Sequence, residues 1–414
     1  MYRGALLFVI AICTYLHVPL VSDGRLLVPS FPTVVLIPLI FLTVRKNITL
    51  RDSLFLTKIA FVLLLSIAFS PGYKYLDEKF LALVQCLMAL GVAVLIVRLM
   101  QQLKTSVLEH SLGAIWMVIL IGCILEILDV TRNLSDEFRE WAFATQYTLY
   151  DADLRDASLV GWPRPKLFSV EPSHVTKFFV ATINAWLLVR ISWAKATAAA
   201  GATLAMLVMM GSPMLLISAA ISLSIVIWSS QASMRTRIAV IFAAIVMIVG
   251  FAAFFASSTL STVTARVSTI GEESDSLTHR PSSEQQRVVV PYITLVDTWL
   301  TWPVFGVGIG AKEVVAEHTR MQLSRPEVAL GNNAFAELGI YLGVVGIALF
   351  IYLFYWQSRQ IGIRRVGMMF LILGLFSQLM GGVVSFQFWG FVALMWGALA
   401  VNDLEVAQVK ASSL

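Results

Sequence analysis

Apolar runs of about 20 residues recur along the chain, and they constrain its fold more than any other feature. A helix of that length just spans the hydrocarbon core of a bilayer. The sequence holds twelve such runs, or eleven if the two runs that meet at Ser212-Pro213 are fused. The runs cover residues 4–21, 29–44, 53–70, 80–100, 108–129, 172–190, 196–211, 213–230, 236–257, 333–355, 365–383 and 386–402. The pattern predicts an all-α integral membrane protein with about twelve (11–12) transmembrane helices.

The composition excludes the main classes of soluble protein. Only 13% of the residues are charged and 58% are hydrophobic, whereas a soluble domain carries roughly 25% charged residues. A soluble enzyme, a secreted disulfide-rich domain and a disordered chain are therefore excluded. Three cysteines without a Cys-x-x-Cys pair argue against a disulfide framework and a zinc site. The first run lacks a small-residue cleavage site before Asp23, so we interpret it as a span and not as a signal peptide.

The placement of lysine and arginine predicts the orientation, because short cytoplasmic loops hold the excess of these residues. If the N-terminus is cytoplasmic, the opposite short loops hold only Arg25, Lys74 and Lys79. The cytoplasmic segments then hold fourteen basic residues, namely Arg3, Arg45, Lys46, Arg51, Arg98, Lys104, Arg190, Lys195, Arg235, Arg237, Arg359, Arg364, Arg365 and Lys410. Both termini are therefore predicted to face the cytoplasm.

Two polar segments, 131–171 and 258–332, are too long to be simple turns, and this topology places both outside the cytoplasm. Loops of this length in a compact protein are usually functional or disordered. The first loop is rich in aromatic residues, which are Trp141, Phe143, Tyr147, Tyr150 and Trp162. We interpret residues 1–414 as a single polytopic membrane domain that carries these two external loops.

The second loop contains a predicted amphipathic helix near residues 284–300. Ser283 and Gln286 have the spacing of a capping box. The apolar residues that recur at helical spacing are Val289, Tyr292, Val296 and Leu300. We expect this helix to lie along the outer membrane surface or over a cavity.

Arginines gather in the two external loops, where an anionic substrate would meet them. The guanidinium group is a permanently charged planar fork that suits phosphate oxygens. The strongest candidates for binding a lipid-linked phosphate or pyrophosphate adjoin apolar or helix-starting segments, and they are Arg164, Arg266, Arg280 and Arg287. The alternative is that they are solvated loop charges, some of which touch lipid headgroups.

The segment that opens the span at 172–190 places two further candidates together. Pro172 is favourable at a helix start, so Glu171 stands at the positive end of the helix. Glu171 is a candidate general base, and the alternative is a helix cap. His174 lies three residues on and can share its helical face. A metal would need more ligands than these two, so none is predicted.

The span at 333–355 opens with Asn332 and Asn333 and carries Glu337 one turn in. An ionisable residue inside a span is a functional hypothesis by default. The alternative for Glu337 is an interhelical hydrogen bond or the neutralisation of an arginine. Lys58 and Lys177 also lie within spans, and we interpret them as snorkelling side chains.

Several short patterns resemble known motifs without the required context. Asp151-Ala152-Asp153 matches the metal-binding pattern of nucleotide-sugar transferases but falls in an external loop. Gly306, Gly308 and Gly310 lack the strand and helix of a dinucleotide site. The sequence has no Walker motif and no cluster of basic residues for nucleic acid.

Three segments, taken in order, resemble a known family. Arg164 to Ser173 is similar to the R-x6-E-P-S segment of exopolysaccharide polymerases. Arg287, followed by Trp299, Pro303 and Phe305-Gly306-Val307-Gly308, resembles an arginine–tryptophan–P-x-x-G-x-G stretch. Asn332-Asn333, nine residues and Gly343-Val344-Val345-Gly346 match the spacing of the H-[NSQ]-x9-G-x-x-G motif of O-antigen ligases. The chain therefore resembles the superfamily of bacterial O-antigen polymerases (Wzy-type) and O-antigen ligases.

This resemblance implies glycosyl transfer at the periplasmic face of the bacterial inner membrane. A polymerase of this kind transfers a growing glycan from undecaprenyl pyrophosphate to the sugar of an incoming lipid-linked repeat unit. The ligases have a histidine where this chain has Asn332, and this difference favours a polymerase. Neither a metal nor another cofactor is expected, and a chain-length regulator is a candidate partner beside membrane lipids.

The resemblance also suggests roles for the candidate residues. Arginines would bind the pyrophosphate and stabilise its charge. Glu171 is the first candidate for the base that deprotonates the acceptor hydroxyl, with His174 and Glu337 as the next, and Asn332 and Asn333 would bind substrate.

Three alternatives remain at this point. They are an O-antigen ligase, whose acceptor is the lipid A core, a peptidoglycan glycan-strand polymerase, and a twelve-span transporter. A transporter usually shows internal repeats and a site near the bilayer midplane. The polar residues here gather in external loops instead, which favours an enzyme.

Overall fold

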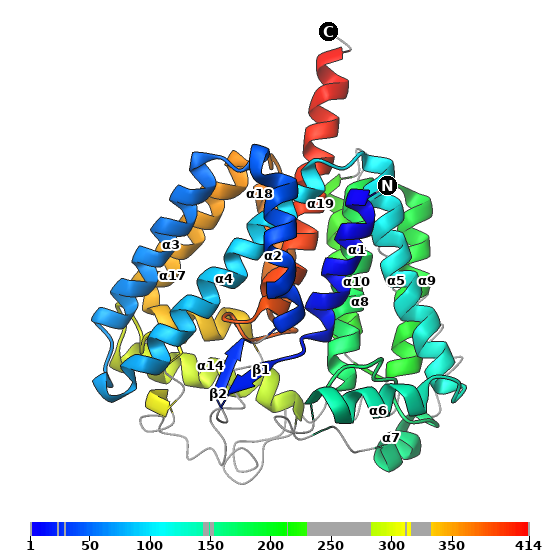
Figure 1. Ribbon diagram of the computed structural model, residues 1–414, viewed down its shortest axis with the longest axis horizontal. Coiled ribbons are helices and arrows are strands. Elements are labelled where there is room, and N and C mark those ends of the chain that lie inside the picture. The colour runs from blue at the N-terminus through cyan, green and yellow to red at the C-terminus, as the bar shows by residue number, and fades with distance from the viewer. Residues whose placement is uncertain are drawn as a thin grey trace.

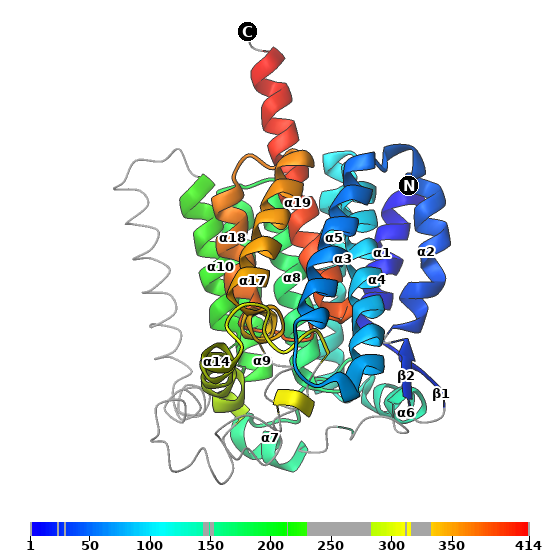
Figure 2. The same ribbon diagram turned by 90° about the vertical axis from the view of Figure 1, so that its left-hand side faces the viewer.

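The protein is a bundle of helices that run up and down between two ends (Figures 1 and 2). The computed structural model describes residues 2–22, 25–28, 30–143, 149, 153–212, 214–229, 283–310, 313–315 and 333–412. Eleven of the twelve predicted runs coincide with a helix, and the run at 236–257 lies outside the described residues. These helices are α1 (Tyr2–Leu16), α2 (Phe31–Val44), α3 (Leu50–Ala68), α4 (Leu76–Gln101), α5 (Thr105–Ile127), α8 (Pro172–Val189), α9 (Trp193–Met210), α10 (Met214–Ser229), α17 (Ala334–Gln360), α18 (Val366–Ser377) and α19 (Phe386–Ser412).

Five stretches of the described helices are long and apolar enough to cross a membrane by length and composition. They are Tyr73–Gln101, Thr105–Ile127, Trp193–Met210, Ala334–Gln360 and Phe386–Val409. Three shorter apolar helices are Tyr2–Leu16, Met214–Ile227 and Val366–Ser377. The helix content is that of an all-α membrane protein, and the number of twelve spans stays a prediction.

The structure corrects the ends of two predicted runs. The run predicted to continue to residue 21 ends as a helix at Leu16, and a short antiparallel hairpin of β1 (Leu20–Ser22) and β2 (Arg25–Val28) follows. The run predicted to continue to residue 383 ends at Ser377, before Gly382 with its left-handed φ of 81°. Between α9 and α10 the chain breaks at Gly211, whose φ of 52° ends α9. The two runs that meet at Ser212-Pro213 are therefore separate helices.

Helices α8 and α19 lie at the centre of the bundle, and α19 packs against α4 and α8. Nearly all of α8 is buried. Small residues let the helices approach closely: a Cβ atom added to Gly397 would lie 2.6 Å from the sulfur of Met100. Such close packing of small residues is the usual way in which helices associate in a membrane.

The remaining elements lie at the end of the bundle opposite to the two termini (Figures 1 and 2). They are the hairpin, α6 (Arg132–Phe143), α7 (Asp153–Val160) and α14 (Ser283–Thr301). Two short 3-10 turns, Arg45–Asn47 and Tyr73–Tyr75, join neighbouring helices. Helix α14 confirms the helix predicted near 284–300, and Figure 1 shows it lying across the bundle rather than along it. The described parts of both predicted external loops therefore share one end of the molecule.

Candidate functional site

The end of the bundle away from the termini holds the described candidate residues. Glu171 stands at the N-cap position of α8, where Pro172 begins the helix. Its Oε1 atom lies 3.8 Å from Nε2 of His174 and 4.0 Å from Nζ of Lys177. The hydroxyl of Ser173 donates a hydrogen bond to the same oxygen. Glu171, at the N-cap just before the helix, and His174 therefore lie close together, and their roles in proton transfer stay predictions.

The exposure of the side chains at the start of α8 decreases from Glu171 to Lys177. The exposed fractions are 34% for Glu171, 20% for His174 and 9% for Lys177. The side chain of Glu171 accepts no capping hydrogen bond from α8, but its charge lies at the positive end of the helix, as the capping alternative has it. A carboxylate beside an imidazole and an ammonium group, partly open to the surroundings, can accept a proton from a substrate hydroxyl.

Arg164 pairs with a carboxylate of the protein. Its Nε lies 2.8 Å from Oδ2 of Asp156 in α7, and the side chain of Asp156 is fully buried. The indole of Trp162 donates to the carbonyl of Met209 at 2.9 Å, which fixes the same segment to the end of α9. Binding of a phosphate by Arg164 stays a prediction.

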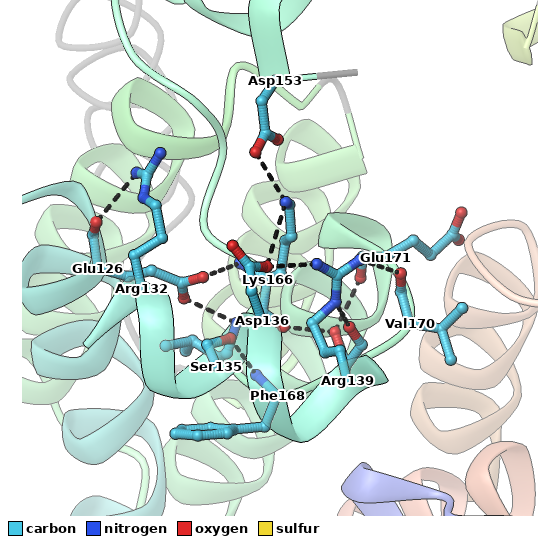
Figure 3. Close-up of polar contacts among 12 residues, drawn as sticks. Glu126, Arg132, Ser135, Asp136, Arg139, Asp153, Lys166, Phe168, Val170 and Glu171 are labelled. Atoms are coloured by element: carbon cyan, nitrogen blue, oxygen red, sulfur yellow. Dashed lines mark hydrogen bonds and ion pairs between the residues drawn. The ribbon is translucent and has the colours of Figure 1, made fainter. Parts of the chain in front are cut away.

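The segment between α7 and α8 is held by side chains of other helices (Figure 3). Lys166 forms an ion pair with Asp153 at 2.8 Å, so this half of the Asp-Ala-Asp pattern has a structural partner. Glu126 and Arg139 bond to the backbone of residues 166–170. In Figure 3 the side chain of Glu171 points away from this cluster.

Asn333 and Glu337 anchor the segment between α18 and α19. Asn333 caps α17, because its Oδ1 accepts from the N–H of Ala336 at 3.0 Å, and its Nδ2 donates to Gln378 at 2.7 Å. The carboxylate of Glu337 accepts from the N–H groups of Gly382 and Val383 at 2.5 and 3.0 Å. Both side chains are almost fully buried. The structure thus gives both a positioning role, and their predicted roles in substrate binding and proton transfer stay predictions.

Helix α14 packs against α17. Thr294 and Thr298 of α14 are buried. Near the end of the helix, Nε1 of Trp299 donates to the carbonyl of Gly339 in α17 at 2.9 Å. These contacts fix α14 against the bundle, and the binding of substrate by Arg287 stays a prediction.

The glycine-rich stretch is a backbone joint between the segment after α14 and a break in α17. Gly343 has a φ of 64°, which interrupts α17. The N–H groups of Val307 and Gly308 donate to the carbonyls of Ile340 and Tyr341, both at 3.0 Å. Beyond the break, Val344 and Val345 donate to Pro303 and Val304. Unpaired backbone groups are costly in a membrane, and this exchange pairs those freed by the break.

Four of the predicted site residues have no described side chain. Arg266, Arg280 and Asn332 lie outside the described residues, and for Arg287 only the backbone is described. The two lysines predicted to snorkel each lie beside a specific side chain. Lys58 lies over the ring of Trp356 at 4.4 Å, and Lys177 lies beside Glu171.

Sequence reasoning overlooked Glu126. This carboxylate lies inside the predicted span at 108–129, and its position within an apolar run was the signal that could have identified it. Arg139 and Lys166 belong to the first predicted loop, and the partners of these two residues lie too far away in the sequence for a local pattern to predict them.

Comparison with models of protein families gives a match to the second half of the bundle. Residues 196–351 match the model of a protein family described as O-antigen ligase. The matched region includes α9, α10, α14 and most of α17, and with them the segments from Arg287 to Gly308 and from Asn332 to Gly346. A search of curated proteins gives no match.

Proposed function

Because the chain is a member of the O-antigen ligase and polymerase superfamily, we propose that it polymerises lipid-linked oligosaccharide repeat units. The family match is the observation that carries the proposal, since it suggests O-antigen polymerase or ligase activity. Together with the apolar helices, it points to an enzyme of lipopolysaccharide assembly in the inner membrane. Asn332 at the position of the ligases' histidine favours a polymerase over a ligase.

In the proposed reaction, the donor is a growing glycan on undecaprenyl pyrophosphate and the acceptor is a repeat unit on a second such lipid. The anomeric carbon of the donor forms a bond to an acceptor hydroxyl oxygen. The bond from that carbon to the pyrophosphate oxygen breaks, and undecaprenyl pyrophosphate leaves with the electron pair. The donor is already activated, so the reaction needs neither ATP nor a metal.

Glu171 is the proposed general base. It accepts the proton of the acceptor hydroxyl, with His174 at 3.8 Å and Lys177 at 4.0 Å beside the carboxylate. Arg164, Arg266, Arg280 and Arg287 are the proposed ligands of the pyrophosphate and stabilise the charge that develops on it. We assign the end opposite to the termini to the periplasm, where lipid-linked repeat units are presented.

Deletion of the gene, followed by gel analysis of surface glycans, separates the candidate functions. A polymerase predicts loss of long chains, with single repeat units still attached to their final carrier. Complete loss of attachment, with long lipid-linked chains accumulating, would identify a ligase instead. Unchanged glycans with altered uptake of small molecules would indicate a transporter.

Complementation then tests the arginine in α14. We expect Arg287→Ala to restore no chain extension although the protein reaches the membrane. Arg132→Ala is the matched control, because Arg132 forms an ion pair with Asp129 at 3.3 Å, outside the proposed site. Wild-type chain lengths with Arg287→Ala would remove this residue from the mechanism.

A further inference from the structure

We propose that Glu126 and Arg139 are positioning residues that set the place of Glu171 by holding the backbone of residues 166–170. The proposal rests on the proposed function, in which Glu171 is the general base. Both residues bind the segment that precedes Glu171. Each acts on the backbone that leads to it.

The held segment has a backbone conformation that it would not keep on its own. Leu167 and Phe168 are successive non-glycine residues with φ angles of 42° and 64°. A residue in this left-handed region is strained and persists only where surrounding contacts enforce it. Strain of this kind, directly before a proposed catalytic residue, calls for an account of what enforces it.

Glu126 enforces it from the end of α5. Its side chain is buried, and its two carboxylate oxygens accept hydrogen bonds from successive backbone N–H groups. Oε1 accepts from Lys166 at 3.2 Å, and Oε2 accepts from Leu167 at 2.8 Å. A carboxylate that accepts from two adjacent N–H groups fixes both position and orientation of that peptide.

Arg139 holds the other end of the segment from α6. Its Nε donates to the carbonyl of Ser169 at 2.8 Å, and its Nη2 donates to the carbonyl of Val170 at 3.1 Å. Asp136 accepts from Nη1 at 2.6 Å and so balances the buried charge. The planar guanidinium fork thus donates hydrogen bonds to the two successive carbonyls immediately before Glu171.

Two neutral side chains join Glu126 and Arg139 in binding the backbone of residues 166–170, and we call these four side chains the clamp. The hydroxyl of Ser135 in α6 accepts from the N–H of Phe168 at 2.9 Å. The hydroxyl of Tyr15 in α1 donates to the carbonyl of Leu167 at 2.7 Å. Each of the five residues from 166 to 170 therefore has a backbone group bonded to a side chain of α1, α5 or α6.

This arrangement can position a general base and leave its carboxylate available to the substrate. All of these bonds go to backbone groups, whereas the side chain of Glu171 points away from the clamp (Figure 3). A general base must lie within hydrogen-bond reach of the proton it removes. A displacement of about 1 Å can lower a rate by about 100-fold, so a rigid connection to three helices has a direct catalytic value.

The test compares Arg139→Lys and Glu126→Gln with Arg132→Gln, each as the full chain in nanodiscs. In Arg139→Lys the charge is kept, but the planar fork that donates to two successive carbonyls is lost. In Glu126→Gln the amide places an N–H donor opposite one of the two backbone N–H groups. Arg132 is the matched control, because it lies in the same helix and donates to the carbonyl of Glu126 at 3.0 Å but not to the segment.

Two measurements are made on each variant. The first is kcat and KM for a lipid-linked repeat unit, and we expect kcat to fall about 100-fold while KM keeps its wild-type value. The second is the rate at which trypsin cuts after Lys166, which is buried in the folded protein. We expect both clamp variants to be cut faster than wild type and Arg132→Gln to match wild type in both measurements.

The outcomes separate this inference from the proposed function. If Glu171→Gln is inactive but both clamp variants keep wild-type kcat, positioning is wrong and the function stands. If Glu171→Gln keeps wild-type kcat, the role of the base fails and the inference fails with it. An equal fall of kcat in Arg132→Gln would show general destabilisation and overturn the inference. If Arg139→Lys and Glu126→Gln fail to fold, Tyr15→Phe is used in their place, because it removes one hydrogen bond of the clamp. An unchanged kcat in Tyr15→Phe would count against the inference.

Discussion

The two ends of the bundle use buried charge differently. At the end of the termini, charged side chains join one helix to another. Arg98 of α4 donates to both carboxylate oxygens of Asp52 in α3, at 2.9 and 3.1 Å, and Gln357 of α17 donates to the same carboxylate at 2.6 Å. Arg365, directly before α18, binds Asp403 of α19 at 2.7 Å, and Asp403 also accepts from the backbone N–H groups of Arg364 and Arg365. At the opposite end, Arg139 and Glu126 bind a loop, and Glu171 remains partly exposed.

The difference teaches which charges to associate with function. A charge whose partners belong to other helices defines how the helices pack. A charge that shapes the backbone beside a partly open carboxylate builds a site. Burial alone does not separate the two, because Asp52 and Glu126 are equally buried. The group to which each charge is bonded does separate these two roles. The following variants test this distinction, from the largest expected effect to the smallest.

Glu171→Gln should produce the largest effect on activity. General base catalysis contributes about 10²–10⁴-fold, so chain extension by the purified protein should fall by that factor while thermal unfolding is unchanged. Glu140→Gln is the matched control, because Glu140 is an exposed residue of α6 at the same end. Equal activities of the two variants would contradict the assigned site.

Asp52→Asn should act in the opposite way. It leaves Arg98 without its counter-ion, and breaking a buried pair costs about 3–5 kcal/mol. Thermal unfolding in detergent should therefore move to lower temperature, while activity per folded molecule stays at the wild-type value. A selective loss of activity at wild-type stability would place this network in the reaction and end the comparison.

Gly343→Ala should weaken the joint between the glycine-rich stretch and α17. An added Cβ would lie 2.5 Å from the backbone nitrogen of Gly306, and the φ of 64° favours glycine. We expect a loss of about 1–3 kcal/mol in the free energy of unfolding. Gly374→Ala is the control, because no atom lies within 4 Å of its added Cβ. Equal stability of both variants would contradict the joint.

Trp299→Phe should have the smallest effect. It removes one hydrogen bond to the carbonyl of Gly339, worth about 1 kcal/mol, and keeps most of the ring. A small drop in the unfolding temperature is expected, with a wild-type KM for the lipid-linked donor. A large rise in that KM would mean that Trp299 meets the substrate and does not merely fix α14.

The sequence predicted the helices well because apolar length determines them. It also predicted the helix at 284–300 and the meeting of Glu171 with His174, since both follow from local spacing. It could not predict the bond from Tyr15 to Leu167, which joins residues 152 positions apart. The end of α18 at Ser377 was missed because residues 378–383 continue an apolar run although the backbone leaves the helix.

Part of the site follows from tertiary contacts that no local pattern encodes. The amide of Asn333 caps α17 and binds Gln378, and the second of these contacts joins residues 45 positions apart. The glycines at 306 and 308 were recognised as unlike a nucleotide site, yet their partner, the break at Gly343, becomes visible only in the fold.

The most direct test of the central claim is chain extension by the purified full-length protein in nanodiscs, with undecaprenyl-pyrophosphate-linked repeat units as the only substrate and EDTA present. The account predicts that the wild type makes longer lipid-linked glycans and releases undecaprenyl pyrophosphate, while Glu171→Gln does neither and Glu140→Gln matches the wild type. Absence of longer glycans with the wild type, or equal rates for all three proteins, would contradict it.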